Sequence, residues 1–138
     1  MRLSTVGRYA LRAMVDLAQH QGGEPVLRKE IAQRQEISSD YLAQLFARLR
    51  RAGLVESVLG PGGGYVLAKH PAEISAGDVL RAVDESLDPA PCVGVEPKDA
   101  CSRTEGCSTR LLWQRMTEAI VDVVDTVTLA DLCAPQRQ

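Results

Sequence analysis

The stretch ISSDYLAQLFARLRRAGLVESVLGPGGGYVLAK, residues 37–69, decides the fold of this chain. Its first half predicts a helix, because Ser38 or Ser39 can accept a hydrogen bond from the first turn and Gly53 can end the last turn. Apolar residues recur at every third or fourth position of this helix, so we expect an inward stripe of Tyr41 or Leu42, Leu45 and Leu49. The second half predicts a β-hairpin.

Two strands and a glycine-rich turn make up the predicted hairpin. Residues 54–58 alternate apolar and polar side chains, as a half-buried strand does, and residues 65–69 form the second strand. The turn LGPGGG between them, residues 59–64, is so tight that it needs glycines. We refer to this hairpin as the wing.

Two further helices are predicted before residue 37. Residues 4–20 form the first, with Ser4 or Thr5 as the N-cap and a stop at Gly22 and Gly23. Residues 27–35 form a short second helix without a good capping residue. Helix, helix, turn, helix and hairpin is the order of a winged helix-turn-helix, in which the third helix enters the major groove of DNA and the hairpin touches the flanking backbone.

A long C-terminal helix is predicted after the wing and a fourth helix at residues 75–86. Ser108 is the expected N-cap of this long C-terminal helix, which covers about residues 109–126. A capping box is predicted just after it, at residues 128–131. Its apolar stripe predicts a dimer interface of Trp113, Met116, Ile120, Val123, Val124 and Val127. The alternative is that this stripe packs on the DNA-binding part of the same chain.

The predicted fold class is mainly α with a small β-hairpin wing, a winged helix-turn-helix plus a long C-terminal dimerisation helix. We expect a DNA-binding domain at residues 1–83, a cysteine-bearing sensor loop at 84–107, and the dimerisation helix and tail at 108–138. Of the 138 residues, 45% are hydrophobic and only 4% aromatic, which favours an aliphatic helical core. No stretch approaches the roughly 20 apolar residues of a membrane span, and charged residues exclude a secretion signal. We therefore expect a cytoplasmic protein with reduced thiols and no membrane partner.

Charge and side-chain chemistry place the expected DNA contacts on the third helix and the wing. Residues 1–80 hold ten basic and eight acidic residues, whereas residues 81–138 hold six and ten. Gln44 can donate and accept together, as adenine requires, while the arginines can neutralise phosphates and the glycines let backbone N–H groups approach them. The predicted DNA-binding residues are Ser38, Ser39, Asp40, Tyr41, Gln44, Arg48, Arg50, Arg51, Gly60, Pro61, Gly62 and Gly63.

Each of these groups also has a plainer interpretation. The arginines can be a solvated helix end that complements the negative pole of the helix dipole. The glycines can serve the tight turn alone, and Asp40 can cap the helix, accept from cytosine or repel phosphates. GPGGG does not match an enzyme's phosphate loop, because no Lys-Ser/Thr follows it and it leads into a strand. The ordered set of elements favours DNA binding over a winged helix that binds only protein.

Three cysteines, Cys92, Cys101 and Cys107, lie in the Pro- and Gly-rich segment PCVGVEPKDACSRTEGC, residues 91–107. Their spacing lacks the tight pairs of zinc knuckles and suits a loop wrapped around a larger inorganic core. Unrelated free cysteines, a thiol switch or a zinc site stay open as alternatives. The sequence gives less support to an enzyme with a reactive cysteine, since no Cys-His pair, carboxylate pair or cofactor fingerprint is present.

Several stretches together resemble the family of the iron–sulfur cluster regulator IscR. They are MRLSTVGRYALRAMVDLA, IAQRQEISSDYLAQLFARLRRAGLVES, GPGGGYVLA, VLRAVDES and the three cysteines before a long helix. The resemblance implies a homodimeric winged-helix transcription factor whose third helix and wing bind a double-stranded DNA operator. It also implies an iron–sulfur cluster at Cys92, Cys101 and Cys107, with 2Fe–2S favoured over 4Fe–4S.

The chain departs from the IscR pattern at the cluster and at the DNA. Arg110 stands where a histidine ligand is expected, and an arginine has no lone pair for a metal. Arg8 stands where nitric-oxide-sensing relatives use an acid. Ala43 replaces a glutamate in the third helix and Leu59 replaces an arginine at the wing, so the operator sequence does not carry over. The remaining candidates for a fourth ligand are Glu96, Asp99, Glu105, Cys133, a partner-chain side chain or a small exogenous ligand.

We therefore expect a transcriptional repressor whose operator affinity is controlled by the cluster, in response to iron, cluster supply, redox state or nitric oxide. Ordering of residues 91–107 beside the long helix would set the distance and angle between the two third helices of a dimer. The alternative is a winged-helix regulator that responds through thiol oxidation or zinc. Catalytic residues are not expected.

Overall fold

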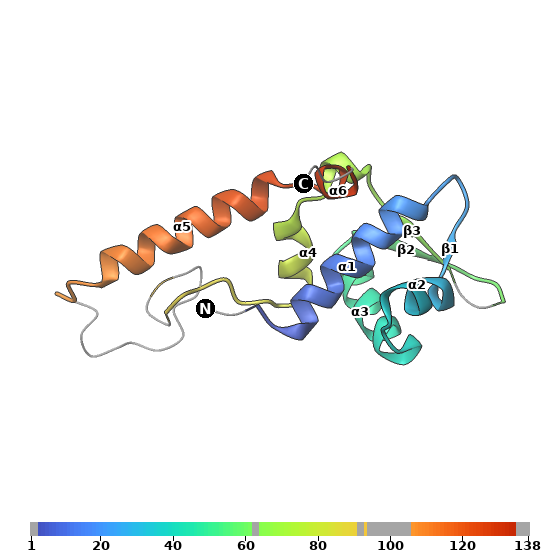
Figure 1. Ribbon diagram of the computed structural model, residues 1–138, viewed down its shortest axis with the longest axis horizontal. Helices are drawn as coiled ribbons and strands as arrows, with labels where there is room; N and C mark the ends of the chain where they lie inside the picture. The colour runs from blue at the N-terminus through green and yellow to red at the C-terminus, as the bar shows by residue number, and fades with distance from the viewer. Residues whose placement is uncertain (1–2, 62–63, 91–92, 94–105, 135–138) are drawn as a thin grey trace.

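The computed structural model describes residues 3–61, 64–90, 93 and 106–134. Figure 1 shows a helical body with a small sheet at one end and one long helix that projects from the other. In chain order the elements are α1 (Thr5–His20), β1 (Val26–Leu27), α2 (Arg28–Gln35), α3 (Ser39–Arg51), β2 (Val55–Val58), β3 (Gly64–Leu67), η1 (Pro71–Glu73), α4 (Ala76–Ala82), α5 (Arg110–Thr126) and α6 (Leu129–Cys133). The predicted fold class is confirmed.

Short polar side chains start the helices where the sequence predicts them. Ser4 and Ser38 each accept a hydrogen bond from a backbone N–H in the first turn of α1 and α3. Thr128 and Asp131 form the predicted capping box at the start of α6, in which each side chain binds the other residue's backbone N–H. These caps fix the entry point of each helix.

The end of α3 is also confirmed, because Gly53 stops it in a left-handed conformation with φ of 79°. The N–H of Gly53 binds the carbonyl oxygen of Arg50, and the N–H of Leu54 binds that of Leu49, both at 3.0 Å. This pair of bonds is a Schellman motif. It turns the chain directly from α3 into the first strand of the wing.

Two predicted helix caps are wrong. The helix α1 ends at Gln21 in extended backbone and not at a left-handed glycine, and the side chain of Gln21 accepts a hydrogen bond from Leu67 N at 2.6 Å. That bond ties the end of α1 to β3. At the start of α5, Thr109 takes the N-cap in place of Ser108, with helical backbone and no side-chain capping bond.

A short strand that the sequence did not predict precedes α2. Val26 and Leu27 pair antiparallel with Tyr65 and Gly64, so the sheet described here has the order β1-β3-β2. The predicted second helix therefore begins one residue late, at Arg28, because Leu27 is held extended. Gly64 is needed at this crossing, since a Cβ there would lie 3.0 Å from Cβ of Pro25.

The hydrophobic core lies between α1, α2, α3, α4 and the sheet. Its largest fully buried side chain, Phe46 of α3, stacks on Tyr65 of β3 with ring centroids 4.0 Å apart. Leu129 of α6 is fully buried in the same cluster, which fastens the C-terminal segment to α1. The stripe predicted for the third helix is confirmed, because Leu42, Leu45 and Leu49 are buried, and Met14, Val79 and Val83 are buried as well.

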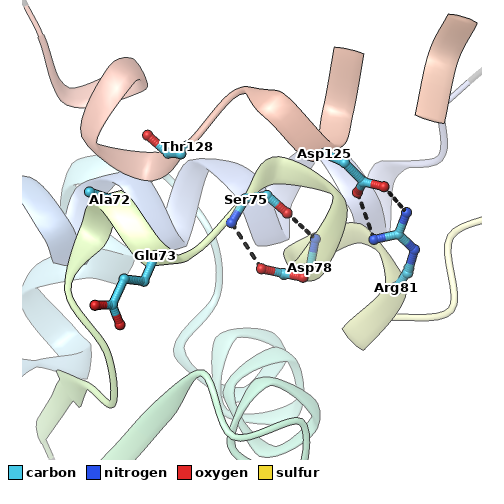
Figure 2. A pocket seen from close by; sticks show the side chains of 7 residues that line it. All are labelled: Ala72, Glu73, Ser75, Asp78, Arg81, Asp125 and Thr128. Atoms are coloured by element: carbon cyan, nitrogen blue, oxygen red, sulfur yellow. Dashed lines mark hydrogen bonds and ion pairs between the residues drawn. The ribbon is translucent and has the colours of Figure 1, made fainter. Parts of the chain in front are cut away.

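Helix α5 differs from the rest, because none of its residues is buried. It meets the body through α4 at its C-terminal end and projects away from there (Figure 1). Figure 2 shows that junction, where Arg81 of α4 forms an ion pair with Asp125 of α5 at 2.7 Å. The carboxylate of Asp125 lies over Gly77, where a Cβ would collide with it.

Backbone bonds complete the α4–α5 junction just past the end of α5. Ala76 N donates to Val127 O at 2.8 Å, and Leu129 N donates to Ile74 O at 2.9 Å. Ser75 thereby pairs with Thr128 as an isolated antiparallel bridge. Among the described residues, no helix is both long enough and apolar enough to cross a membrane.

Candidate nucleic-acid interface and sensor segment

The exposed side of α3 carries most of the predicted base-reading residues. Asp40 and Gln44 are exposed, while Tyr41 is half-buried and its ring meets that of Tyr9 edge-on at 6.0 Å. Ser38 accepts from Tyr41 N at 3.2 Å, so its oxygen serves as the helix cap. Its hydroxyl proton stays available to donate. The structure thus brings these predicted residues together on the first turns of one helix.

The three predicted phosphate-binding arginines have different surroundings. Arg50 and Arg51 are exposed at the end of α3. Arg48 donates from Nη1 to the carbonyl oxygen of Val83 at 3.3 Å, at the end of α4. Arg48 therefore joins α3 to the start of the sensor loop, a role that the sequence did not predict.

The tip of the wing is exposed and contains the residue that departs from the IscR pattern. Leu59 is 98% exposed, and Gly60 adopts a φ of 153° that disfavours any side chain. Pro61 is also exposed, whereas Gly62 and Gly63 lie outside the described residues. An apolar tip therefore replaces a positive charge at the end of the wing.

A buried carboxylate that the sequence did not predict holds α2 against α1. Asp16 is 1% exposed and receives Arg34 Nη2 at 2.7 Å and Gln35 Nε2 at 2.8 Å. Burial raises the pKa of Asp16, but the hydrogen bonds from Arg34 and Gln35 and the charges of Arg34 and His20 outweigh it, so the pKa lies below its usual value. An acid in the inward stripe of an amphipathic helix is the signal that could have found it.

The predicted sensor loop, residues 84–107 and below also called the sensor segment, is tied to the fold at both of its ends. At its start, Glu85 accepts hydrogen bonds from the backbone N and the hydroxyl of Ser4, and thus holds the N-cap residue of α1. Leu87 and Val93 are buried. At its end, Cys107 lies just before α5, with Sγ 3.2 Å from Thr109 Oγ1. The predicted ligands Cys92 and Cys101 lie outside the described residues.

Arg110 occupies the first turn of α5, where the IscR pattern has a histidine. Its Nε is buried and has no hydrogen-bond partner in the part of the chain that the structure describes. His20 and His70 are engaged elsewhere, because His20 Nδ1 binds the Asp16 carbonyl at 2.8 Å and His70 Nδ1 accepts from Ala72 N at 3.1 Å. The described residues contain no cluster of three metal-binding side chains.

Cys133, one candidate for the fourth ligand, lies at the wrong end of α5. It follows the C-terminus of this 17-residue helix, whereas Cys107 precedes the N-terminus. At 1.5 Å per residue the helix separates the two by about 25 Å. Cys133 Sγ instead faces the carbonyl oxygen of Val15 at 3.9 Å, and burial raises the pKa of its thiol. Within one chain it does not share a centre with Cys107.

Fold and site together define a class of protein, the winged-helix transcriptional regulators. A capped recognition helix, a wing and a projecting helix behind a cysteine segment are its parts here. The chain belongs to the Rrf2 family, described as iron-dependent transcriptional regulators, whose pattern matches residues 3–135.

Curated relatives within this family carry the name HTH-type transcriptional regulator IscR. The chain is 49% identical to that of Erwinia tasmaniensis over 99% of its length and 81% of the relative. It is 48% identical to that of Serratia proteamaculans over 96% of its length and 79% of the relative. The protein is therefore an IscR-like transcriptional regulator of the Rrf2 family, and the predicted family resemblance is confirmed.

Solved structures agree with the fold over almost the whole chain. CymR, the global cysteine regulator of B. subtilis, superposes with a TM-score of 0.81 at 39% identity and covers 96% of each chain. The IscR of T. potens gives 0.73 at 42% identity, over 96% of this chain and 85% of that one. The oxidized form of Staphylococcus aureus CymR gives 0.80 at 36% identity over both whole chains.

Proposed function

We propose that the operator affinity of this regulator is controlled by an iron–sulfur cluster held at Cys92, Cys101 and Cys107. The observation that carries the proposal is how the sensor segment is attached, through Glu85 to the start of α1 and through Cys107 to the start of α5. Any ordering of this segment acts on both helices. The IscR names of its relatives support the cluster. The sequence resemblance favours 2Fe–2S over 4Fe–4S.

The residues described at the site fit a thiolate-held group. Cys107 is half-buried, and the hydroxyl of Thr109 lies within hydrogen-bond distance of its sulfur, an arrangement that tunes bound metal centres. When bound, a cluster supplies a redox-active, thiolate-ligated core. Arg110 cannot donate a lone pair, so the fourth ligand comes from another residue or from a small molecule.

The DNA contacts proposed for this regulator lie on α3 and the wing. Ser38, Ser39, Asp40, Tyr41 and Gln44 face the major groove, and the exposed arginines and the wing tip approach the phosphates. We place the protein in the cytoplasm, since its relatives are bacterial transcription regulators, and we propose that it acts as a repressor. A coupling of about 1–3 kcal/mol between the sensor segment and DNA would change affinity by roughly 5- to 150-fold.

Anaerobic purification tests the cluster. We expect a coloured protein containing iron and sulfide, and the change Cys107→Ser should remove the visible absorption. Cys133→Ser is the matched control and should keep the colour, because Cys133 lies at the other end of α5. A colourless wild-type protein that takes up no iron on reconstitution would refute cluster control.

A homodimer through α5 is the second part of the proposal. Helix α5 leaves Leu112 and Val123 more than half exposed, and Trp113, Met116 and Ile120 are only half-buried in a single chain. The alternative raised by the sequence is that this stripe packs on the DNA-binding part of the same chain. Contacts within the one chain leave the stripe unburied. An apolar stripe of this length on a helix is covered in solution by another surface, here a second α5.

Sedimentation of two lysine variants tests the dimer. Val124→Lys places a charge in the stripe and should yield monomers. The Glu118→Lys variant is the control and should remain dimeric, because Glu118 lies about 200° around the helix from Ile120. A Val124→Lys protein that sediments as a dimer would contradict the assignment.

Thiol chemistry is a second candidate, favoured by the likeness to a solved regulator in its oxidized form. Cys107 lies beside a hydroxyl that can stabilise a thiolate. Treatment of the iron-free protein with a mild thiol oxidant separates the two ideas. Under cluster control, operator binding by the iron-free protein is insensitive to the oxidant, whereas under thiol control it changes and recovers on reduction.

A further inference from the structure

Arg28 makes a contact with the recognition helix α3 that the function described so far does not use. It is the first residue of α2, and its Nε donates to the hydroxyl oxygen of Ser39, the first residue of α3, at 3.1 Å. Both side chains are half-buried. The contact therefore joins the first residues of the two helices that make up the helix-turn-helix.

The hydrogen bond from Arg28 determines whether the Ser39 hydroxyl acts toward DNA mainly as a donor or as an acceptor. A hydroxyl carries one donor hydrogen and two acceptor lone pairs, and here a permanently charged guanidinium occupies one lone pair. A cationic donor polarises the O–H bond and strengthens it as a donor. Ser39 therefore presents a hydrogen atom more readily than a lone pair.

Ser38, the neighbouring N-cap residue, also presents its hydroxyl hydrogen more readily than a lone pair, but for a different reason. Its oxygen accepts from the N–H of Tyr41, so both serines at the start of α3 use an acceptor position within the protein. Ser38 owes this to the helix backbone, which any sequence of α2 would leave in place. Ser39 owes it to one side chain, Arg28, and so its bias can be removed by a single substitution.

We propose that Arg28 is a positioning residue for DNA reading, which holds the Ser39 hydroxyl as a donor toward an acceptor on a base edge. In the major groove, the acceptors are N7 and O6 of guanine, N7 of adenine and O4 of thymine, whereas cytosine offers an amino donor. The base facing Ser39 is thus selected against cytosine. This inference rests on the proposed placement of α3 in the major groove.

Selection from a pool of randomised DNA duplexes, with the full-length protein in one fixed cofactor state, tests the role of Arg28. Arg28→Ala and Ser39→Ala should relax base preference at the same position of the half-site. Each should weaken binding to the wild-type site roughly two- to tenfold, the size of one neutral hydrogen bond. The double variant should bind like either single variant, because the two residues act as one unit.

Two further variants separate this role from charge and from folding. Arg28→Gln keeps a donor without the charge and should restore most of the base preference. Lys29→Ala removes the neighbouring exposed charge and should leave the preference intact. Thermal unfolding of each variant shows whether it is folded, and Ser39→Ala tests the prediction even if Arg28→Ala is unstable.

Three outcomes would overturn the inference or its basis, and they differ from one another. If Arg28→Ala lowers the salt dependence of DNA affinity by the amount expected for about one phosphate contact and leaves the base preference unchanged, then Arg28 contacts a phosphate directly. A Ser39→Ala variant with unchanged preference would remove the role of the pair. A wild-type protein that selects no sequence would instead refute the DNA reading itself.

Discussion

The winged-helix part, residues 3–83, and helix α5 solve the problem of burial in opposite ways. In the first, α1 to α4 each bury at least one apolar side chain against the others. In the second, 17 helical residues leave every side chain at least partly exposed. The winged-helix part is thus stabilised within one chain, whereas α5 relies on its junction with α4 and, in the proposed dimer, on a second α5. Substitutions that act on one region and spare the other test this contrast.

The largest effect is expected in the core. Phe46→Ala removes the fully buried ring that stacks on Tyr65 and should lower the free energy of unfolding by about 3–5 kcal/mol. Val123→Ala on α5, at a residue that is 59% exposed, should change it by only about 0.5 kcal/mol in a monomeric background such as Val124→Lys. Urea denaturation measures both, and similar losses in the two variants would contradict the contrast.

The buried carboxylate of the winged-helix part should give the next largest effect. Asp16→Asn weakens the bonds with Arg34 and Gln35 and should cost about 2 kcal/mol near neutral pH. The lowered pKa of Asp16 means that this stability is complete above its ordinary value of 3.8 and is lost as pH falls through the lower folded value.

Thermal melts between neutral pH and strongly acidic pH check the Asp16 prediction. The gap between the wild type and Asp16→Asn should be constant above pH 3.8 and should close below it. Asp40→Asn, at an exposed position on α3, is the control and should show no such convergence. A gap that stays open in strong acid would mean that the Asp16 charge does not hold α2 on α1.

A smaller effect on stability, but a specific effect on geometry, is expected at the junction. Gly77→Ala puts a methyl group where the Asp125 carboxylate lies, so the Arg81–Asp125 ion pair must open. Alanine's helix preference offsets part of the cost, so unfolding should change by less than about 1 kcal/mol. The angle of α5 changes, and with it the preferred spacing between half-sites.

Selection on duplexes with variable half-site spacing reads out the Gly77→Ala effect. Adding Asp125→Ala to Gly77→Ala removes the collision and should return the spacing preference toward that of Asp125→Ala alone. An unchanged spacing preference in Gly77→Ala would show that the junction does not set the angle of α5.

The smallest effect is expected for the ion pair itself. The side-chain hydrogen bond between Arg81 and Asp125, together with the attraction between their charges, raises the pKa of Arg81 and lowers the pKa of Asp125. Both side chains are more than a third exposed, so Asp125→Asn should cost at most about 1 kcal/mol. The loss should shrink further in high salt, and a larger, salt-insensitive loss would indicate a buried interaction.

The same contrast explains what the sequence could predict. Local rules sufficed for the caps Ser4 and Ser38, the stop at Gly53 and the wing, because each depends on neighbours in the chain. The strand Val26–Leu27 and the Arg28–Ser39 contact join residues distant in sequence, so no periodicity reveals them. The helical pattern could have marked Asp16 as a buried acid, but it could not have identified Arg34 as its partner. For the proposed cluster ligands the sequence goes further than the described residues, which include Cys107 but neither Cys92 nor Cys101.

The attachment of α5 at one end makes it a lever. Its pivot is the junction of Asp125 with Arg81 and Gly77, and Cys107 lies beyond the opposite end (Figure 1). With an arm of about 25 Å, a shift of about 2 Å at the cysteine end turns the helix by only about 5° at the pivot. A displacement of a few ångströms at the cysteine end of α5 therefore becomes a rotation of only a few degrees at the junction, a scale suited to adjusting the two recognition helices of the proposed dimer on DNA.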